Sequence, residues 1–304
     1  MRKLPGALTR IEEAVLRRAL PSRRRALLAA AGCAALLCGC SAPGSGEAIA
    51  LAQGVVWQVD NQHIDPHGDW NKLGVTDLLV QWTAVDDTSF LPGAGLPTAA
   101  RLPDWTRIAG EPWARNVIVG LAGRFDEKAA RAQAARLIQQ SKQLAAARPA
   151  VHIDGYYFPV EVDPTWKDAA ALAPLLDQLP RPLWISVYDP SNIGGAALAA
   201  WLDSWLPHDV GVFLQDGCGV YARGPAAARA YADALTARFG RDRVRIIAEA
   251  FRPAVGGGFR SATAAELTPQ LQAYRGYRTY LFDGPHYVSA QLVQDLLTLQ
   301  ATPK

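Results

Sequence analysis

Short runs of apolar, often β-branched or aromatic residues recur along the chain from residue 54 onward, and they alternate with stretches of helical pattern. Eight such runs occupy residues 54–59, 78–82, 117–121, 151–158, 183–188, 210–215, 244–249 and 279–282. Most are apolar on both faces, as parallel strands covered by helices must be. Helical patterns lie between them at residues 126–147, 169–179, 195–206, 225–239, 264–274 and 289–299. This alternation predicts an α/β protein with one (β/α)8 TIM barrel over residues 48–304.

An open, doubly wound sheet is the alternative architecture for the same alternation. That fold uses a glycine-rich turn after its first strand to approach a dinucleotide phosphate. The residues at this position, Gln58 to Asn61, include no glycine. We therefore favour the closed barrel.

The first 39 residues are typical of a bacterial signal peptide. Their basic stretch ends at Arg25, and an apolar run of small residues continues to Cys40. At 1.5 Å per residue this run is too short to cross a bilayer of about 30 Å. The ending Leu37-Cys38-Gly39-Cys40 resembles the lipobox of bacterial lipoproteins, which implies lipidation of Cys40. The paired arginines also resemble a twin-arginine signal, and a buried N-terminal helix is the alternative.

This interpretation predicts where the mature protein is found. Residues 40–47 would form the lipidated cysteine and a flexible tether, with Ser41 after the lipid site. In enterobacterial lipoproteins an Asp at that position signals retention in the inner membrane, so its absence favours the outer membrane, facing the periplasm. We expect a monomer that contacts the membrane only through its lipid.

Charge and cysteine content exclude two classes of function. The formal net charge is +3, but residues 1–39 carry eight Lys or Arg against two Glu. The remainder therefore carries 23 basic and 26 acidic residues, which disfavours nucleic-acid binding. Cleavage before Cys40 would leave Cys218 as the one free thiol, so neither a disulfide nor a cysteine-based metal site is expected.

Polar residues cluster after the predicted strands, where barrel enzymes place their active sites. We expect these residues, with two tryptophans, to bind substrate: Trp57, Gln58, Asp60, Gln81, Trp82, Tyr188, Gln215, Asp216 and Asp283. The tryptophans could stack on sugar rings or simply belong to the core. Two glutamates stand out, because Glu161 follows the fourth run and Glu249 ends the seventh.

The placement of these glutamates resembles that of the large clan of retaining glycoside hydrolases with (β/α)8 barrels. The resemblance implies that Glu161 is the general acid/base and Glu249 the nucleophile. Retention requires the two carboxyl groups to lie about 5–5.5 Å apart. The clan usually has Asn directly before the acid/base, whereas this chain has Val160. Gln215 or Gln81 would have to supply the missing amide.

In detail the chain resembles the bacterial barrel proteins known as the domain of unknown function 4434 family. The resembling segments are Val56-Trp57-Gln58 with Trp70, and residues 79–83, 155–161 and 214–220. This resemblance implies a glycosidase-like barrel without specifying a substrate. A glycoside hydrolase that acts on a polysaccharide or oligosaccharide is the leading hypothesis.

Two other functions remain open at this point. The absent Asn suggests a glycan-binding lipoprotein without catalytic activity that keeps the barrel groove. For each glutamate taken singly, the structural alternative is that it caps a helix or pairs with Arg252 or Arg124. The sequence Asp60, His63, Asp65 and His67 suggests a metal-dependent polysaccharide deacetylase. Because this segment contains proline and glycine and therefore forms a loop, we expect no metal or other cofactor.

Overall fold

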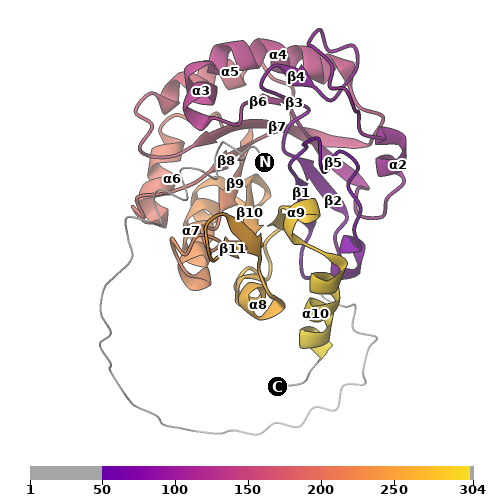
Figure 1. The fold of residues 1–304 in the computed structure, drawn as a ribbon. Coiled ribbons are helices and arrows are strands. Elements are labelled where there is room, and N and C mark those ends of the chain that lie inside the picture. Colours follow the sequence, from indigo (N-terminus) through magenta and orange to yellow (C-terminus); the bar gives the residue numbers. More distant parts are fainter. Residues whose placement is uncertain (1–49, 302–304) are drawn as a thin grey trace, which may run out of the picture.

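The computed structural model describes residues 50–301, and Figure 1 shows their fold. The signal peptide over residues 1–39, the lipidation site Cys40 and the tether lie outside the described residues. Within residues 50–301 no helix is long and apolar enough to span a membrane.

Eight parallel strands form a closed barrel, which confirms the predicted fold. In chain order these strands are β1 (Gly54–Trp57), β2 (Asp77–Val80), β5 (Asn116–Gly120), β7 (Ile153–Val162), β8 (Leu183–Val187), β9 (Val210–Gln215), β10 (Val244–Glu249) and β13 (Thr279–Phe282). Each strand pairs with the next in this order, and β13 closes the barrel on β1, where Gly54 pairs with Tyr280. Seven of the eight match the predicted runs to within a few residues, whereas β7 continues four residues further, to Val162.

Helices surround the barrel at the predicted positions (Figure 1). They are α3 (Glu127–Ala132), α4 (Ala134–Ala147), η2 (Ala169–Leu172), α5 (Ala173–Leu176), α6 (Gly195–Asp203), α7 (Pro225–Phe239), η3 (Arg241–Arg243), α8 (Ala264–Ala273) and α10 (Ala290–Ala301). Asp126 caps α3 by accepting a hydrogen bond from the Ala129 N–H at 2.6 Å. The single helix expected over residues 126–147 is interrupted at Gln133, whose backbone leaves the helical conformation.

The connections after the first two strands depart from a regular barrel. A 3-10 helix, η1 (Trp70–Leu73), follows β1, and the short α2 (Trp105–Ala109) follows β2. Two small sheets extend the carboxyl ends of the strands. One contains β3 (Ala84–Val85), β4 (Thr88–Ser89) and β6 (Ala122–Gly123), and the other is the hairpin of β11 (Phe251–Pro253) and β12 (Phe259–Ser261).

Side chains, not solvent, fill the barrel interior. The buried cluster inside the barrel consists of Val56, Leu79, Ile118, Tyr157, Trp184, Phe213, Ile247 and Tyr280. A glycine on a strand makes room for the largest of these rings, because a Cβ on Gly211 would lie 2.3 Å from the Trp184 ring. This packing is the reason that the site must lie at an end of the barrel.

A buried polar network closes the amino-terminal end of the barrel. Arg245 lies over the Trp184 ring, 3.9 Å from its centroid, and donates to the Tyr280 hydroxyl at 2.7 Å. That hydroxyl donates in turn to Asp77 at 2.8 Å. In barrels of this type the active site lies at the opposite, carboxyl end of the strands.

Candidate active site

Glu161 lies within the last residues of β7, not after the strand as expected. The register of β7 against β8 shifts between Phe158 and Val162. The strand therefore continues past Pro159 and carries Glu161 at its carboxyl end. The Gln215 side chain, from the end of β9, donates to Glu161 Oε1 at 2.7 Å. Gln215 and Gln81 were the two amides considered as substitutes for the clan's Asn, and Gln215 is the one that contacts Glu161.

Glu249 is the last residue of β10 and is only 2% exposed. Its Oε2 accepts a hydrogen bond from the Gly219 N–H at 2.7 Å. A Cβ on Gly219 would lie 2.8 Å from the same oxygen, so this backbone approach requires glycine. The loop after β9 therefore supplies a backbone donor that holds the Glu249 carboxyl group in place.

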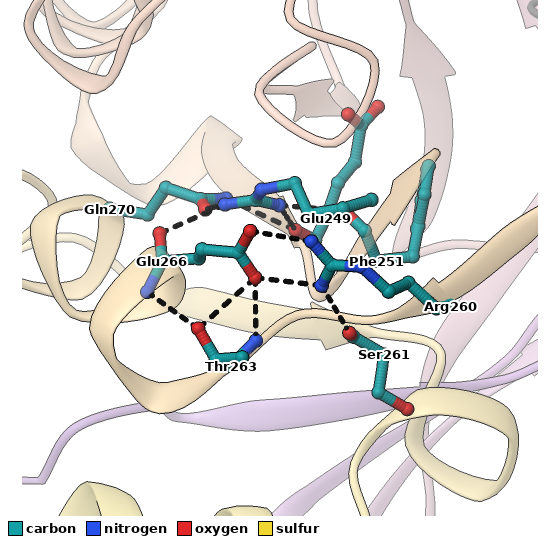
Figure 2. Close-up of polar contacts among 8 residues, drawn as sticks. Glu249, Phe251, Arg260, Ser261, Thr263, Glu266 and Gln270 are labelled. Carbon is teal, nitrogen blue, oxygen red and sulfur yellow. Dashed lines mark hydrogen bonds and ion pairs between the residues drawn. The ribbon is translucent and has the colours of Figure 1, made fainter. Parts of the chain in front are cut away.

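Side chains of β11 and α8 donate hydrogen bonds to the backbone at the end of β10. The Glu249 backbone oxygen accepts hydrogen bonds from Arg252 at 3.0 Å and from the Gln270 side chain at 3.2 Å. Figure 2 shows the Glu249 carboxyl group pointing away from these contacts. Gln270 also donates to Asp216 at 2.7 Å, so one amide of α8 joins the ends of β9 and β10.

The first turn of α8 is itself attached to the β11–β12 hairpin (Figure 2). Arg260 donates to both carboxylate oxygens of Glu266, at 2.8 and 2.7 Å. Thr263 and Glu266 form a reciprocal capping box, in which the Thr263 N–H donates to Glu266 at 2.8 Å. The hairpin, α8 and the end of β10 are therefore connected by hydrogen bonds.

Burial raises the pKa of both glutamates. For Glu161 the pKa is raised to about 7 by burial and by the charge of Glu127, against the Gln215 hydrogen bond. For Glu249 it is raised to about 8 by burial and by the charge of Asp216, against the Gly219 N–H. Asp216 accepts four hydrogen bonds, from Cys218, Glu249, Gln270 and Tyr274, but burial outweighs them and raises the pKa of Asp216 as well. Both glutamates can therefore hold a proton near neutral pH.

Tyr188 lies in the electrostatic field of both glutamates. Its pKa is raised to about 12 by burial, then by the charge of Glu249 and, more weakly, by that of Glu161. Arg223 lies against the Tyr188 ring and donates to the backbone oxygens of Asp189 and Asp216, which follow β8 and β9. Because Glu161 and Glu249 lie at the carboxyl ends of the parallel strands β7 and β10, both belong to the same end of the barrel as Tyr188, which follows β8.

A second polar cluster lies after β1 and β13. His286, on the short helix α9 (Gly284–Tyr287), contacts Asp60 Oδ2 through Nε2 at 3.1 Å and Asp283 Oδ2 through Nδ1 at 3.0 Å. Burial lowers the pKa of His286, but the hydrogen bonds to Asp283 and Asp60 outweigh burial and raise the pKa to about 10. The ring of His63 lies against that of His286, with 3.8 Å between centroids and 44° between the ring planes.

The nine predicted substrate-binding residues divide into two groups. Gln58, Asp60, Tyr188 and Gln215 are partly exposed at the carboxyl end of the barrel, as a substrate contact requires. Trp57, Gln81, Trp82, Asp216 and Asp283 are buried, each at most 8% exposed. Asp216 and Asp283 therefore act beneath the surface, on Glu249 and His286 respectively.

Neither predicted tryptophan presents an open ring face. The Trp57 indole is 0% exposed, packs against Trp105 and donates to the His63 backbone oxygen at 2.8 Å. The Trp82 indole packs edge-on against Phe125 and donates to the Val59 backbone oxygen at 2.8 Å. This placement gives both tryptophans a packing role, the alternative that the sequence left open.

Two contributors to the site were not among the predicted site residues. His286 could have been suspected, because it follows Asp283 by three residues at the end of the last strand. Gly219, which donates to Glu249, appears in the sequence analysis only as part of the resembling segment 214–220. Backbone donors of this kind become recognisable only when the loop is folded.

Comparisons with known proteins support the fold. No family model matches the chain, and no curated protein matches it. A solved structure from Bacteroides thetaiotaomicron VPI-5482, which carries the provisional description alpha-L-fucosidase, matches with a TM-score of 0.55 at 16% identity. The match covers 82% of this chain and 90% of that chain. At this identity the similarity shows the barrel fold alone.

Proposed function

We propose that this protein is a glycoside hydrolase whose catalytic residues are Glu161 and Glu249. The observation that carries the proposal is the pair of glutamates at the ends of β7 and β10, each with a raised pKa and both acting on Tyr188. Hydrolysis of a glycoside requires one carboxylic acid and one carboxylate on opposite sides of the scissile bond. A pair of glutamates at one barrel mouth can meet that requirement.

In the mechanism that strand position suggests, Glu161 donates its proton to the departing glycosidic oxygen. A pKa of about 7 keeps a sizeable protonated fraction at neutral pH. Glu249 then attacks the anomeric carbon and forms a glycosyl–enzyme bond as the bond to the leaving oxygen breaks. Water, deprotonated by Glu161, releases the sugar and restores both carboxyl groups.

Without substrate, the pKa shifts of the two glutamates do not distinguish the general acid from the nucleophile as directly as strand position does. Burial and the charge of Asp216 raise the pKa of Glu249, although a nucleophile must be ionised. The positive charge that develops at the anomeric carbon favours the Glu249 carboxylate, as does the Gly219 N–H. The reversed assignment, with Glu249 as the acid, is the alternative within the same function.

The proposal is tested by Glu161→Gln and Glu249→Gln in the purified full chain, with Glu111→Gln as the matched control. Glu111 pairs with Arg107 through a 2.7 Å contact, apart from the two glutamates. The substrates are aryl glycosides, including an aryl α-L-fucoside because of the structural neighbour, and a set of polysaccharides. Each site variant should lower kcat/KM by at least about 10²-fold, whereas the control should not.

The same variants separate the two roles. An aryl glycoside with an acidic phenol needs no proton to depart, so Glu161→Gln should retain more activity on it than on a natural glycan. Glu249→Gln should lose activity on both substrates, and the opposite pattern would assign the acid to Glu249. Product stereochemistry, followed by NMR, distinguishes retention from inversion. Full activity in both variants would disprove the proposal.

Thermal melting of the variants provides a check that does not need a substrate. In the folded state the pKa of Glu249 is raised from the ordinary glutamate value of 4.5 to about 8. The unfolded chain therefore ionises first, and the protein loses stability as the pH rises from 4.5 through about 8. Gln carries no such charge. Glu249→Gln should therefore be at least as stable as the wild type at pH 9.

A glycan-binding protein without hydrolysis is the second candidate. Val160 in place of the clan's Asn favours it, as do the burial and the Asp216 charge that raise the pKa of Glu249 and disfavour its ionised form. It predicts no hydrolysis of any glycan and nearly unchanged glycan affinity in both variants. Calorimetric titration of the two variants with oligosaccharides measures this affinity.

We also propose that the protein is exported, lipidated at Cys40 and held in the outer membrane with its barrel in the periplasm, as a monomer. The support is the apolar run that ends in Leu37-Cys38-Gly39-Cys40. Cys40→Ala should move the protein out of the membrane fraction in a cell fractionation experiment, and Cys218→Ala is the control. A protein that stays with the membrane after Cys40→Ala would contradict the anchor.

A further inference from the structure

Three side chains with metal-binding atoms meet at the carboxyl end of the barrel. Asp60 and His63 lie on the loop after β1, and His286 lies on α9 after β13. One ligand atom from each lies within 4.8 Å of the others. The nearest pairs are His286 Nε2 to Asp60 Oδ2 at 3.1 Å and His63 Nδ1 to Asp60 Oδ1 at 3.3 Å. The fold thus gathers two imidazoles and a carboxylate from opposite ends of the barrel sequence.

These separations suit a small divalent ion. Tetrahedral zinc with bonds of about 2.0–2.1 Å has ligand atoms about 3.3 Å apart. The two nearest contacts of Asp60 have nearly that length. Two imidazoles favour zinc, cobalt or nickel over calcium or magnesium, which take oxygen ligands.

The ring of His286 is also supported as a metal ligand usually is. Its second nitrogen, Nδ1, faces Asp283 Oδ2 at 3.0 Å, and that oxygen also accepts the Gln58 N–H at 2.8 Å. A carboxylate behind a ligating histidine fixes the ring and makes the other nitrogen a better ligand. Asp283, 1% exposed, is therefore placed as the outer carboxylate of such a site.

Three buried atoms of the cluster lack hydrogen bonds. Among the described residues, His63 Nδ1, Asp283 Oδ1 and His286 Nδ1 have no hydrogen-bond partner, although His286 Nδ1 lies in ion-pair contact with Asp283 Oδ2 at 3.0 Å. Buried polar atoms usually have one, and an ion is one of the partners that can account for an exception. His63 Nδ1 lies 3.3 Å from Asp60 Oδ1, close to a second potential ligand atom.

We propose that Asp60, His63 and His286 bind one divalent transition-metal ion of the zinc type, with Asp283 as the supporting carboxylate. Three protein ligands leave a fourth position for water or a substrate oxygen. The three side chains are 13%, 31% and 18% exposed, so an ion can reach them from solvent. This set of ligands was not expected from the sequence, because the metal ligands considered there all lie between Asp60 and His67, and His286 lies outside that segment.

The test is calorimetric titration of the chelator-treated full chain with Zn²⁺, with Co²⁺ absorption as a spectroscopic readout of coordination. We expect one equivalent to bind and a Co²⁺ spectrum typical of a tetrahedral site. His63→Ala and Asp60→Asn should each weaken binding by at least about 100-fold. Asp283→Asn should weaken it by about 10- to 100-fold without changing the stoichiometry.

His67→Ala is the matched control, because His67 lies on the same loop, is 64% exposed and contacts Asp65 instead. It should leave Zn²⁺ affinity unchanged. His63 lies at the edge of the cluster, so its variant should fold normally, which melting in the absence of metal verifies. Failure to bind one equivalent, or equal binding by wild type and His63→Ala, would overturn the proposal and leave a metal-free cluster in which His286 forms ion pairs with Asp60 and Asp283. Neither result depends on whether the protein hydrolyses a glycan.

Discussion

Asp216 is the residue through which the structure most directly controls the charge of Glu249. It is fully buried, and its own pKa is raised by burial. Its negative charge disfavours a second charge on Glu249. Asp216→Asn should therefore lower the pKa of Glu249 by roughly one unit or more. If ionised Glu249 is the nucleophile, the acidic limb of the pH profile of kcat/KM should move to lower pH.

The matched control for this variant is Asp189→Asn. Asp189 is also 0% exposed and accepts hydrogen bonds at the end of the neighbouring strand β8, including one from Tyr231 at 2.7 Å. It is not among the charges that raise the pKa of Glu249. An acidic limb that shifts equally in both variants, or in neither, would contradict the role of Asp216. Circular dichroism establishes that each variant is folded.

At the scale of elements, the capping box of α8 has a measurable energy. Thr263→Ala removes the hydroxyl that accepts the Glu266 N–H, which should cost about 1 kcal/mol of unfolding free energy. For a domain of this size the melting temperature should fall by about 2–4 °C. Differential scanning calorimetry measures both quantities.

Thr268→Ala in the same helix is the comparison for this prediction. Its hydroxyl donates to the Ala264 backbone oxygen inside the helix, and alanine has the higher helix propensity. The melting temperature should therefore change little. A decrease in melting temperature as large as that of Thr263→Ala would mean that loss of a threonine hydroxyl, and not loss of the helix cap, causes the destabilisation.

At the scale of the molecule, closure of the barrel brings the first and last strands together. Gln58, after β1, donates through its backbone to Asp283, after β13, although the two are 225 residues apart. The same closure places His286 beside Asp60 and His63. A site made from both ends of the barrel sequence exists only when all eight strands are paired.

The sequence alone determined the eight strands, the helices between them and the order in which they occur. The reasons are local: apolar runs predict covered strands, and capping residues such as Asp126 mark helix starts. Chain order then led to the barrel and placed Glu161 and Glu249 near the carboxyl ends of their strands. The extent of β7 was missed, because its register shift depends on pairing with β8.

Only the tertiary structure decided which of the expected site residues reach the surface and how they are charged. Trp57 and Trp82 became core residues because neighbouring segments cover both rings. The raised pKa values of Glu161 and Glu249 come from burial and from charges on other elements, which no local pattern encodes. Periodicity and capping act over a few residues, whereas desolvation, ion pairing and ligand geometry act through space between residues distant in the chain.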